Sequence, residues 1–309
     1  MGRKTCERRQ MEAAKSSRKM LILSAVCILT LVFVGTACAG MWYWFNANPS
    51  PTSRNLTLSQ LFKLPPDQLD KVDVGQMDLL CATGLRGSEN LDIPTSLHTL
   101  DEWAAKVKAD VDANLYKFNQ YPGVFRHSVA FFKAQDLVTV LDLDLGCHYD
   151  QDRSNDEPNA TFFASSGPVF IHGLLGSRHA GTCSSIPVLV VAISQRLGWP
   201  VKLVCNSNHF FARWDDGKDR FNIEASNEGG MGSHPDAYYR YWPRPLTDAE
   251  IAREGYLQSM DGRHELAALL GKRIMCLEVN GQKDEAKMIC QKMQQLVPST
   301  QLAELTGGQ

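Results

Sequence analysis

The chain lacks the patterns that mark metalloproteins and disulfide-stapled proteins. Its nine cysteines include no CxxC pair, so their spacing predicts neither a zinc site nor a disulfide framework. The acidic stretch 150–156 is a poor match to a calcium loop, because Asn155 replaces the glycine of the turn and Thr161 replaces the closing glutamate. We therefore expect no metal and no cofactor.

The chain also lacks a strong net charge. With 32 basic and 34 acidic side chains, its formal charge is -2, and no basic stripe runs through the body. A nucleic-acid partner is not expected, because affinity for a phosphate backbone depends on clustered positive charge. The hydrophobic content of 44% is enough for one large core.

The segment 20–45 contains no charged residue, and no Lys or Arg follows it before Arg54. This apolar run is long enough to cross a hydrocarbon core of about 30 Å. Basic residues are concentrated ahead of it, which predicts a cytoplasmic tail over 1–19, a transmembrane helix over 20–45 and a body outside the cytoplasm. A cleaved signal peptide is the alternative, because residues 37–39 read Ala-Cys-Ala and fit a small-x-small cleavage site.

Three parts are predicted after this segment. Residues 46–66 combine four prolines with Ser, Thr and Asn, a composition typical of a linker. Residues 67–258 are predicted to form the main domain, and 259–309 a separate helical tail. Apolar residues recur at helical spacing in the first half of the main domain, over 72–81, 97–116 and 125–145.

The residues that carry chemistry gather in the second half of the main domain. Cys183 opens an apolar segment that predicts a helix, with Pro187 in the first turn and Gly198 as the stop. A helix N-terminus favours thiolate over thiol, so a cysteine placed there can become a nucleophile. His209 opens the second of three predicted strands, 201–205, 209–214 and 220–224.

A thiolate nucleophile needs a base, and the base needs a third group to orient it. Alternation along the last strand puts Asn222 and Glu224 on the same face. Either side chain is therefore available to orient the ring of His209.

This order of residues resembles the core of bacterial transglutaminase-like proteins: Gly-Thr-Cys at 181–183, an apolar helix, a strand opened by His209, then a strand ending in Glu224. The resemblance implies an α+β fold with a papain-like core, in which the helix that follows the cysteine packs against an antiparallel sheet. It also implies Cys183 as nucleophile and His209 as base. Glu224 stands where the family usually has aspartate, and Asn222 remains open as the third residue.

The resemblance implies a cysteine hydrolase or acyltransferase that attacks a peptide or carboxamide bond of a peptide or protein substrate and passes through a thioester. Together with the apolar segment 20–45, it predicts a membrane-anchored enzyme of this kind. The alternative is a catalytically inactive scaffold that binds a protein partner in the cell envelope. The helices expected over 265–277 and 284–296 resemble a single tetratricopeptide-type hairpin, which could hold such a partner.

Overall fold

The computed structural model describes residues 55–153, 162–225 and 230–297. The predicted cytoplasmic tail and transmembrane helix, residues 1–45, lie outside these described residues. Among the helices within them, none is both long enough and apolar enough to cross a membrane.

Two short helices, α2 (Leu58–Leu61) and α3 (Pro66–Leu69), lie within or beside the segment predicted as a linker. Thr57 starts α2 through a capping box with Gln60, and Pro66 suits the first turn of α3 because its missing N–H has no helical partner there. Leu61 is completely buried. Anchoring of this apolar side chain attaches the end of the segment to the core.

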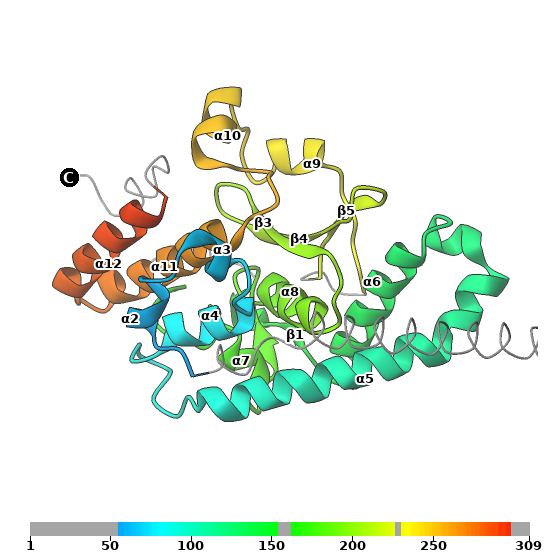
Figure 1. The fold of residues 1–309 in the computed structure, drawn as a ribbon, viewed down its shortest axis with the longest axis horizontal. Coiled ribbons are helices and arrows are strands. Elements are labelled where there is room, and N and C mark those ends of the chain that lie inside the picture. The colour runs from blue at the N-terminus through cyan, green and yellow to red at the C-terminus, as the bar shows by residue number, and fades with distance from the viewer. Residues whose placement is uncertain (1–54, 154–161, 226–229, 298–309) are drawn as a thin grey trace, which may run out of the picture. The chain divides into compact units, whose positions relative to one another are not determined.

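The first half of the body is helical, as the sequence predicts. Its elements are α4 (Val74–Ala82), α5 (Ile93–Gln120), η2 (Pro122–Phe125), α6 (Val129–Thr139) and η3 (Val140–Asp144). The longest of them, α5, begins earlier than its apolar periodicity suggests, because the Asp92 side chain caps it by accepting from the N–H of Thr95. It runs along one side of the body in Figure 1.

An antiparallel sheet in the order β3-β4-β5 follows, made of β3 (Val201–Cys205), β4 (Phe210–Asp215) and β5 (Arg220–Ile223). The predicted α+β class with an antiparallel sheet is confirmed. Helix α8 (Ile186–Arg196) lies on one side of the sheet and α9 (Asp236–Tyr241) on the other (Figure 1).

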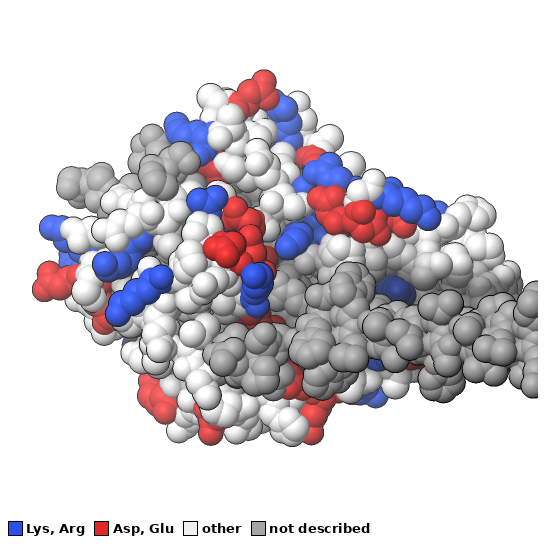
Figure 2. Space-filling model, viewed as in Figure 1, with Lys and Arg blue, Asp and Glu red and all other residues white. Residues whose placement is uncertain are grey.

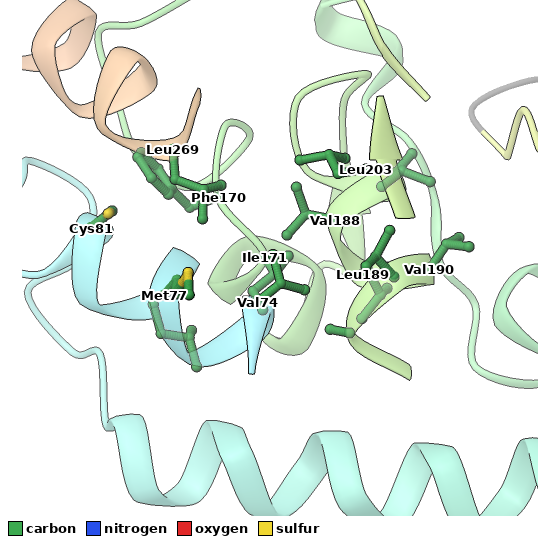
Figure 3. Close-up of a cluster of buried hydrophobic side chains, with 14 of the residues drawn as sticks. Val74, Met77, Cys81, Phe170, Ile171, Val188, Leu189, Val190, Leu203 and Leu269 are labelled. Atoms are coloured by element: carbon green, nitrogen blue, oxygen red, sulfur yellow. The ribbon is translucent and has the colours of Figure 1, made fainter. Parts of the chain in front are cut away.

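Helix α8 is the central element of the core, because its residues 186–193 are all apolar and every residue from Ile186 to Ser194 is buried. Figure 3 shows its valine and leucine side chains between α4 and the sheet, near Leu203 of β3. The same cluster takes in Phe170 and Ile171, which precede α7 (His172–Leu175).

Smaller elements complete the body. Strand β1 (His148–Tyr149) pairs in parallel with β2 (Ala180–Gly181), η4 spans Gln151–Arg153, and α10 spans Asp248–Glu254. Side chains of both signs are interspersed over the face shown in Figure 2, in keeping with the formal charge near zero.

The C-terminal region is helical, with α11 (Gly262–Val279) and α12 (Lys283–Leu296) packed side by side. The turn between them contains Gly281 at a positive φ of 78°, a conformation that favours glycine. Helix α11 also packs against α4, and Leu266, Leu269 and Leu270 belong to the main hydrophobic cluster. The tetratricopeptide-type character of this hairpin stays a prediction.

Candidate active site

Cys183 lies in a hydrogen-bonded turn that runs directly into α8. The N–H groups of Ser185 and Ile186 both donate to the carbonyl of Thr182, and α8 begins at Ile186 with Ser185 as its N-cap. The sequence predicted Cys183 at the helix start, whereas the structure places it two residues before the cap. Pro187 lies in the first turn of the helix, as predicted.

Side chains on both flanks of Cys183 anchor this turn. The hydroxyl groups of Thr182 and Ser185 both donate to the carbonyl of Pro168 at 2.9 Å, and the N–H of Thr182 donates to Ser185 Oγ at 3.0 Å. Both residues are fully buried, whereas Cys183 itself is partly exposed. The thiol is thus presented from a fixed backbone.

Gly181 shows how closely the turn is packed. A Cβ atom added there would lie 2.7 Å from Ser185 Oγ and 2.8 Å from the side chain of Leu174. Such distances are shorter than real Cβ contacts allow, so only glycine fits before the Thr-Cys pair.

His209 immediately precedes β4 and is buried, with 8% of its surface exposed. Its Nε2 atom lies 2.6 Å from Glu224 Oε2, and Glu224 is buried as well. Glu224 lies just beyond β5, in an isolated bridge with Gly232. With Nε2 held by the carboxylate, Nδ1 is the ring nitrogen left to face Cys183.

The environment of His209 favours its protonated form. Burial lowers the pKa, but the hydrogen bonds of the ring to Cys183 and Glu224, together with the negative charge on these groups, outweigh it and raise the pKa from 6.5 to about 9. The structure therefore brings Cys183, His209 and Glu224 together in one interacting group.

Aromatic rings hold the imidazole in place. Tyr239 stacks on it with ring centres 6.0 Å apart, and Trp242 meets it edge-on at 4.9 Å. The Tyr239 hydroxyl also donates to Glu224 Oε2 at 3.2 Å, which fixes the carboxylate. These contacts restrict the orientation of both the ring and its acidic partner.

Asn222, the other candidate for the third residue, is engaged in a different network. Its Oδ1 accepts from Arg213 Nε at 2.7 Å, and its Nδ2 donates to Asp236 and to the carbonyl of His234. Arg213 is completely buried, so these bonds satisfy a charge inside the protein. Asn222 therefore supports the sheet and α9, while the carboxylate two residues later contacts the histidine.

Sequence reasoning missed Tyr149, whose side chain interacts with Cys183. In the parallel pair of β1 and β2, Tyr149 lies opposite Gly181, two residues before the cysteine. Burial raises the pKa of the Tyr149 hydroxyl, and the negative charge of Cys183 and a hydrogen bond to its side chain raise it further; the hydroxyl also bonds the backbone of Cys183. A two-residue strand pair across some thirty residues leaves no pattern in the sequence that would have revealed this contact.

A cavity of about 560 Å³ gives access to the thiol and the imidazole. Cys183 and His209 both line it, together with Phe162, Phe210 and residues of the 250–261 segment. Helix α11 contributes a further wall that includes His264 and Lys272. The cavity is large enough for a side chain and the peptide or amide group that it carries.

A protein-family model described as the transglutaminase-like superfamily matches residues 95–270, more than half of the chain. The chain belongs to this superfamily. The matched residues contain the sheet, α8, the Cys183 turn, His209 and Glu224, and they end within α11. No curated protein and no solved structure matches the chain.

Proposed function

We propose that this transglutaminase-like protein is a cysteine hydrolase or acyltransferase that acts on peptide or carboxamide bonds. The observation that supports it most directly is the buried His209, bonded to Glu224 on one side and interacting with Cys183 on the other, at the wall of an open cavity. A histidine with only a structural role in the core would not be expected to interact with a thiol that faces a cavity.

In the proposed mechanism, Cys183 transfers its proton to His209 Nδ1, and the thiolate sulfur forms a bond to the substrate carbonyl carbon. The carbonyl π electrons move to oxygen, which becomes an oxyanion. The tetrahedral intermediate collapses as the C–N bond breaks, and imidazolium returns its proton to the leaving amine. A thioester remains. Water or a second amine then attacks its carbonyl carbon while His209 accepts a proton from the attacking group; the C–S bond breaks, and the imidazolium proton returns to the Cys183 sulfur.

The Tyr149 hydroxyl is placed to stabilise the oxyanion. It hydrogen-bonds to both the side chain and the backbone of Cys183, so it lies beside the sulfur and can donate to an oxygen formed there. Glu224 holds the ring through Nε2 and balances the charge of the imidazolium. Water as acceptor gives hydrolysis, and a lysine amine gives cross-linking.

The test is the rate at which iodoacetamide alkylates each thiol at pH 6, read by peptide mass spectrometry. Cys205 is the internal reference: it lines the same cavity, and burial raises the pKa of its thiol to about 12. An activated Cys183 should react at least about a hundredfold faster than Cys205. Equal, slow rates would refute the proposal and favour the scaffold alternative.

The location of the activity is a second part of the proposal. The uncharged segment 20–45 and the basic residues ahead of it support a single-pass anchor with the domain outside the cytoplasm. Protease added to cells with a permeabilised outer boundary should then digest the body and spare the tail. A mature protein that begins near Gly40 would refute the anchor while leaving export intact. A protein partner at the α11–α12 hairpin also remains a proposal.

A further inference from the structure

Lys272 is a buried cation that the mechanism above does not use. It lies in the middle of α11, and only 4% of its side chain is exposed. Its Nζ donates to Asp78 Oδ1 at 2.6 Å, to the carbonyl of Val169 at 3.1 Å and to the carbonyl of Ser184 at 3.2 Å. Three donors and three acceptors satisfy the ammonium group completely.

The three acceptors belong to three separate segments that meet behind the nucleophile. Ser184 directly follows Cys183. Val169 follows Pro168, whose carbonyl anchors the two hydroxyls of the same turn. Asp78 lies on α4 and is completely buried, and its second oxygen accepts from the N–H of Ile171 at 2.8 Å.

The surroundings make this arrangement specific for a compact ammonium. Nζ lies 4.5 Å from the centre of the Phe170 ring, and Lys272 also reaches the wall of the cavity that contains Cys183. Leaving a buried charge without its partners costs several kcal/mol of stability, so the ammonium holds its three acceptors at hydrogen-bond distance. Displacement of the Ser184 carbonyl would move the backbone next to the sulfur.

We propose that Lys272 is a positioning residue for the nucleophile: its ammonium ties the Cys183 turn and the 168–171 segment to α4, which makes the C-terminal helix α11 part of the reactive site. The inference rests on the proposed function of Cys183. It assigns to α11 a role in the chemistry in addition to its role in the core.

The neighbouring Arg273 provides a matched control. It is also buried on α11 and also connects that helix to the end of α4, through the carbonyls of Cys81 and Thr83 at 2.8 and 2.7 Å. Its other bond goes to Glu285 of α12. None of these contacts involves residues 182–185, so loss of Arg273 should cost stability without moving the nucleophile.

The experiment compares Lys272→Met with Arg273→Met in the full chain. Iodoacetamide alkylation of Cys183 and Cys205 is measured from pH 5 to 9, well below the melting temperature of each variant. We expect Lys272→Met to slow Cys183 by about tenfold or more, because small displacements of reacting groups have effects of this size. Arg273→Met should stay within about twofold of the parent.

The ratio of the two cysteine rates separates positioning from loss of stability. General loosening would speed the alkylation of the partly buried Cys205, whereas a displaced turn lowers the rate of Cys183 alone. A parental rate in Lys272→Met, or an equal loss in both variants, would overturn the inference while the proposed function stands. Slow alkylation of Cys183 in the parent would overturn both.

If Lys272→Met fails to fold, Lys272→Gln is assayed in the same way. The shorter, neutral amide can still meet a buried acceptor, but it cannot bind all three. A parental Cys183 rate in that variant would equally overturn the inference.

Discussion

The interaction between His209 and Glu224 allows the sharpest prediction. Glu224→Gln keeps the shape of the side chain and removes its charge. The carboxylate is 2.6 Å from His209 Nε2, and both side chains are nearly fully buried, with 6% and 5% exposed. Solvent therefore screens the interaction only weakly, and loss of the carboxylate charge should lower the pKa of His209 substantially.

The size of the effect follows from the pKa of His209. A rise from 6.5 to about 9 corresponds to about 3 kcal/mol of preference for imidazolium, net of burial and shared between Cys183 and Glu224. A hydrogen bond to a charged group contributes about 1.5–3 kcal/mol by itself. Since about 1.4 kcal/mol is a factor of ten in rate, Glu224→Gln should slow the reaction of Cys183 by about a hundredfold.

The assay is the pH profile of Cys183 alkylation, together with an NMR titration of His209. In Glu224→Gln the pKa of His209 should fall, and because imidazolium then favours the thiolate less, the alkylation of Cys183 should require a higher pH. Asn222→Ala is the comparison: it leaves the Nε of buried Arg213 without its acceptor, so it should cost about 1–3 kcal/mol of stability and change the rate less. A parental profile in Glu224→Gln, with a larger loss in Asn222→Ala, would refute the assignment.

The same interaction predicts how stability depends on pH. The pKa of His209 is higher in the folded state, about 9, than its ordinary value of 6.5. Its contribution to the free energy of unfolding is therefore complete below about pH 6.5 and is lost as the pH rises through about 9. In Glu224→Gln this part of the pH dependence should shrink, as measured by urea unfolding at pH 6 and pH 9.5.

Three further predictions concern the thiol, the turn and a buried acid. Cys183→Ala should abolish any hydrolytic or acyl-transfer activity and lower the free energy of unfolding by about 1 kcal/mol or less, whereas the control Cys205→Ala should retain activity. Turnover of the parent's substrates by Cys183→Ala would contradict the assignment of Cys183 as nucleophile. Gly181→Ala should lower the free energy of unfolding by about 1–3 kcal/mol, because the added Cβ would clash with Ser185 and Leu174. The control Gly167→Ala should cost less than about 1 kcal/mol, because the nearest atom to a Cβ added there is 3.8 Å away. Equal urea midpoints for the two variants would contradict the close packing of the turn. Burial raises the pKa of Glu265 to about 8, so the parent should lose stability as the pH rises from about 4.5 through 8. Glu265→Gln has no charge to bury, so it should melt at a higher temperature than the parent at pH 9 but not at pH 5. Identical melting curves of the two proteins at pH 9 would show that the acid is solvated.

Local patterns of residues are enough to predict part of the site. The apolar run 188–193, between Pro187 and the stop at Gly198, predicts a buried helix, because each local signal acts within a few residues of chain. Alternation around the 215–218 turn likewise predicts the hairpin whose open end, away from the turn, carries both His209 and Glu224. The α+β class followed from these elements together.

Which groups contact one another depends on how distant segments pack. Asn222 and Glu224 share a face in the sequence pattern, and only the packing of α9 directs one to Arg213 and the other to His209. Tyr149 and Lys272 reach Cys183 and its turn from segments 34 residues before and 89 residues after the thiol. Contacts at such separations depend on the topology of the whole chain, so periodicity and capping signals contain no information about them.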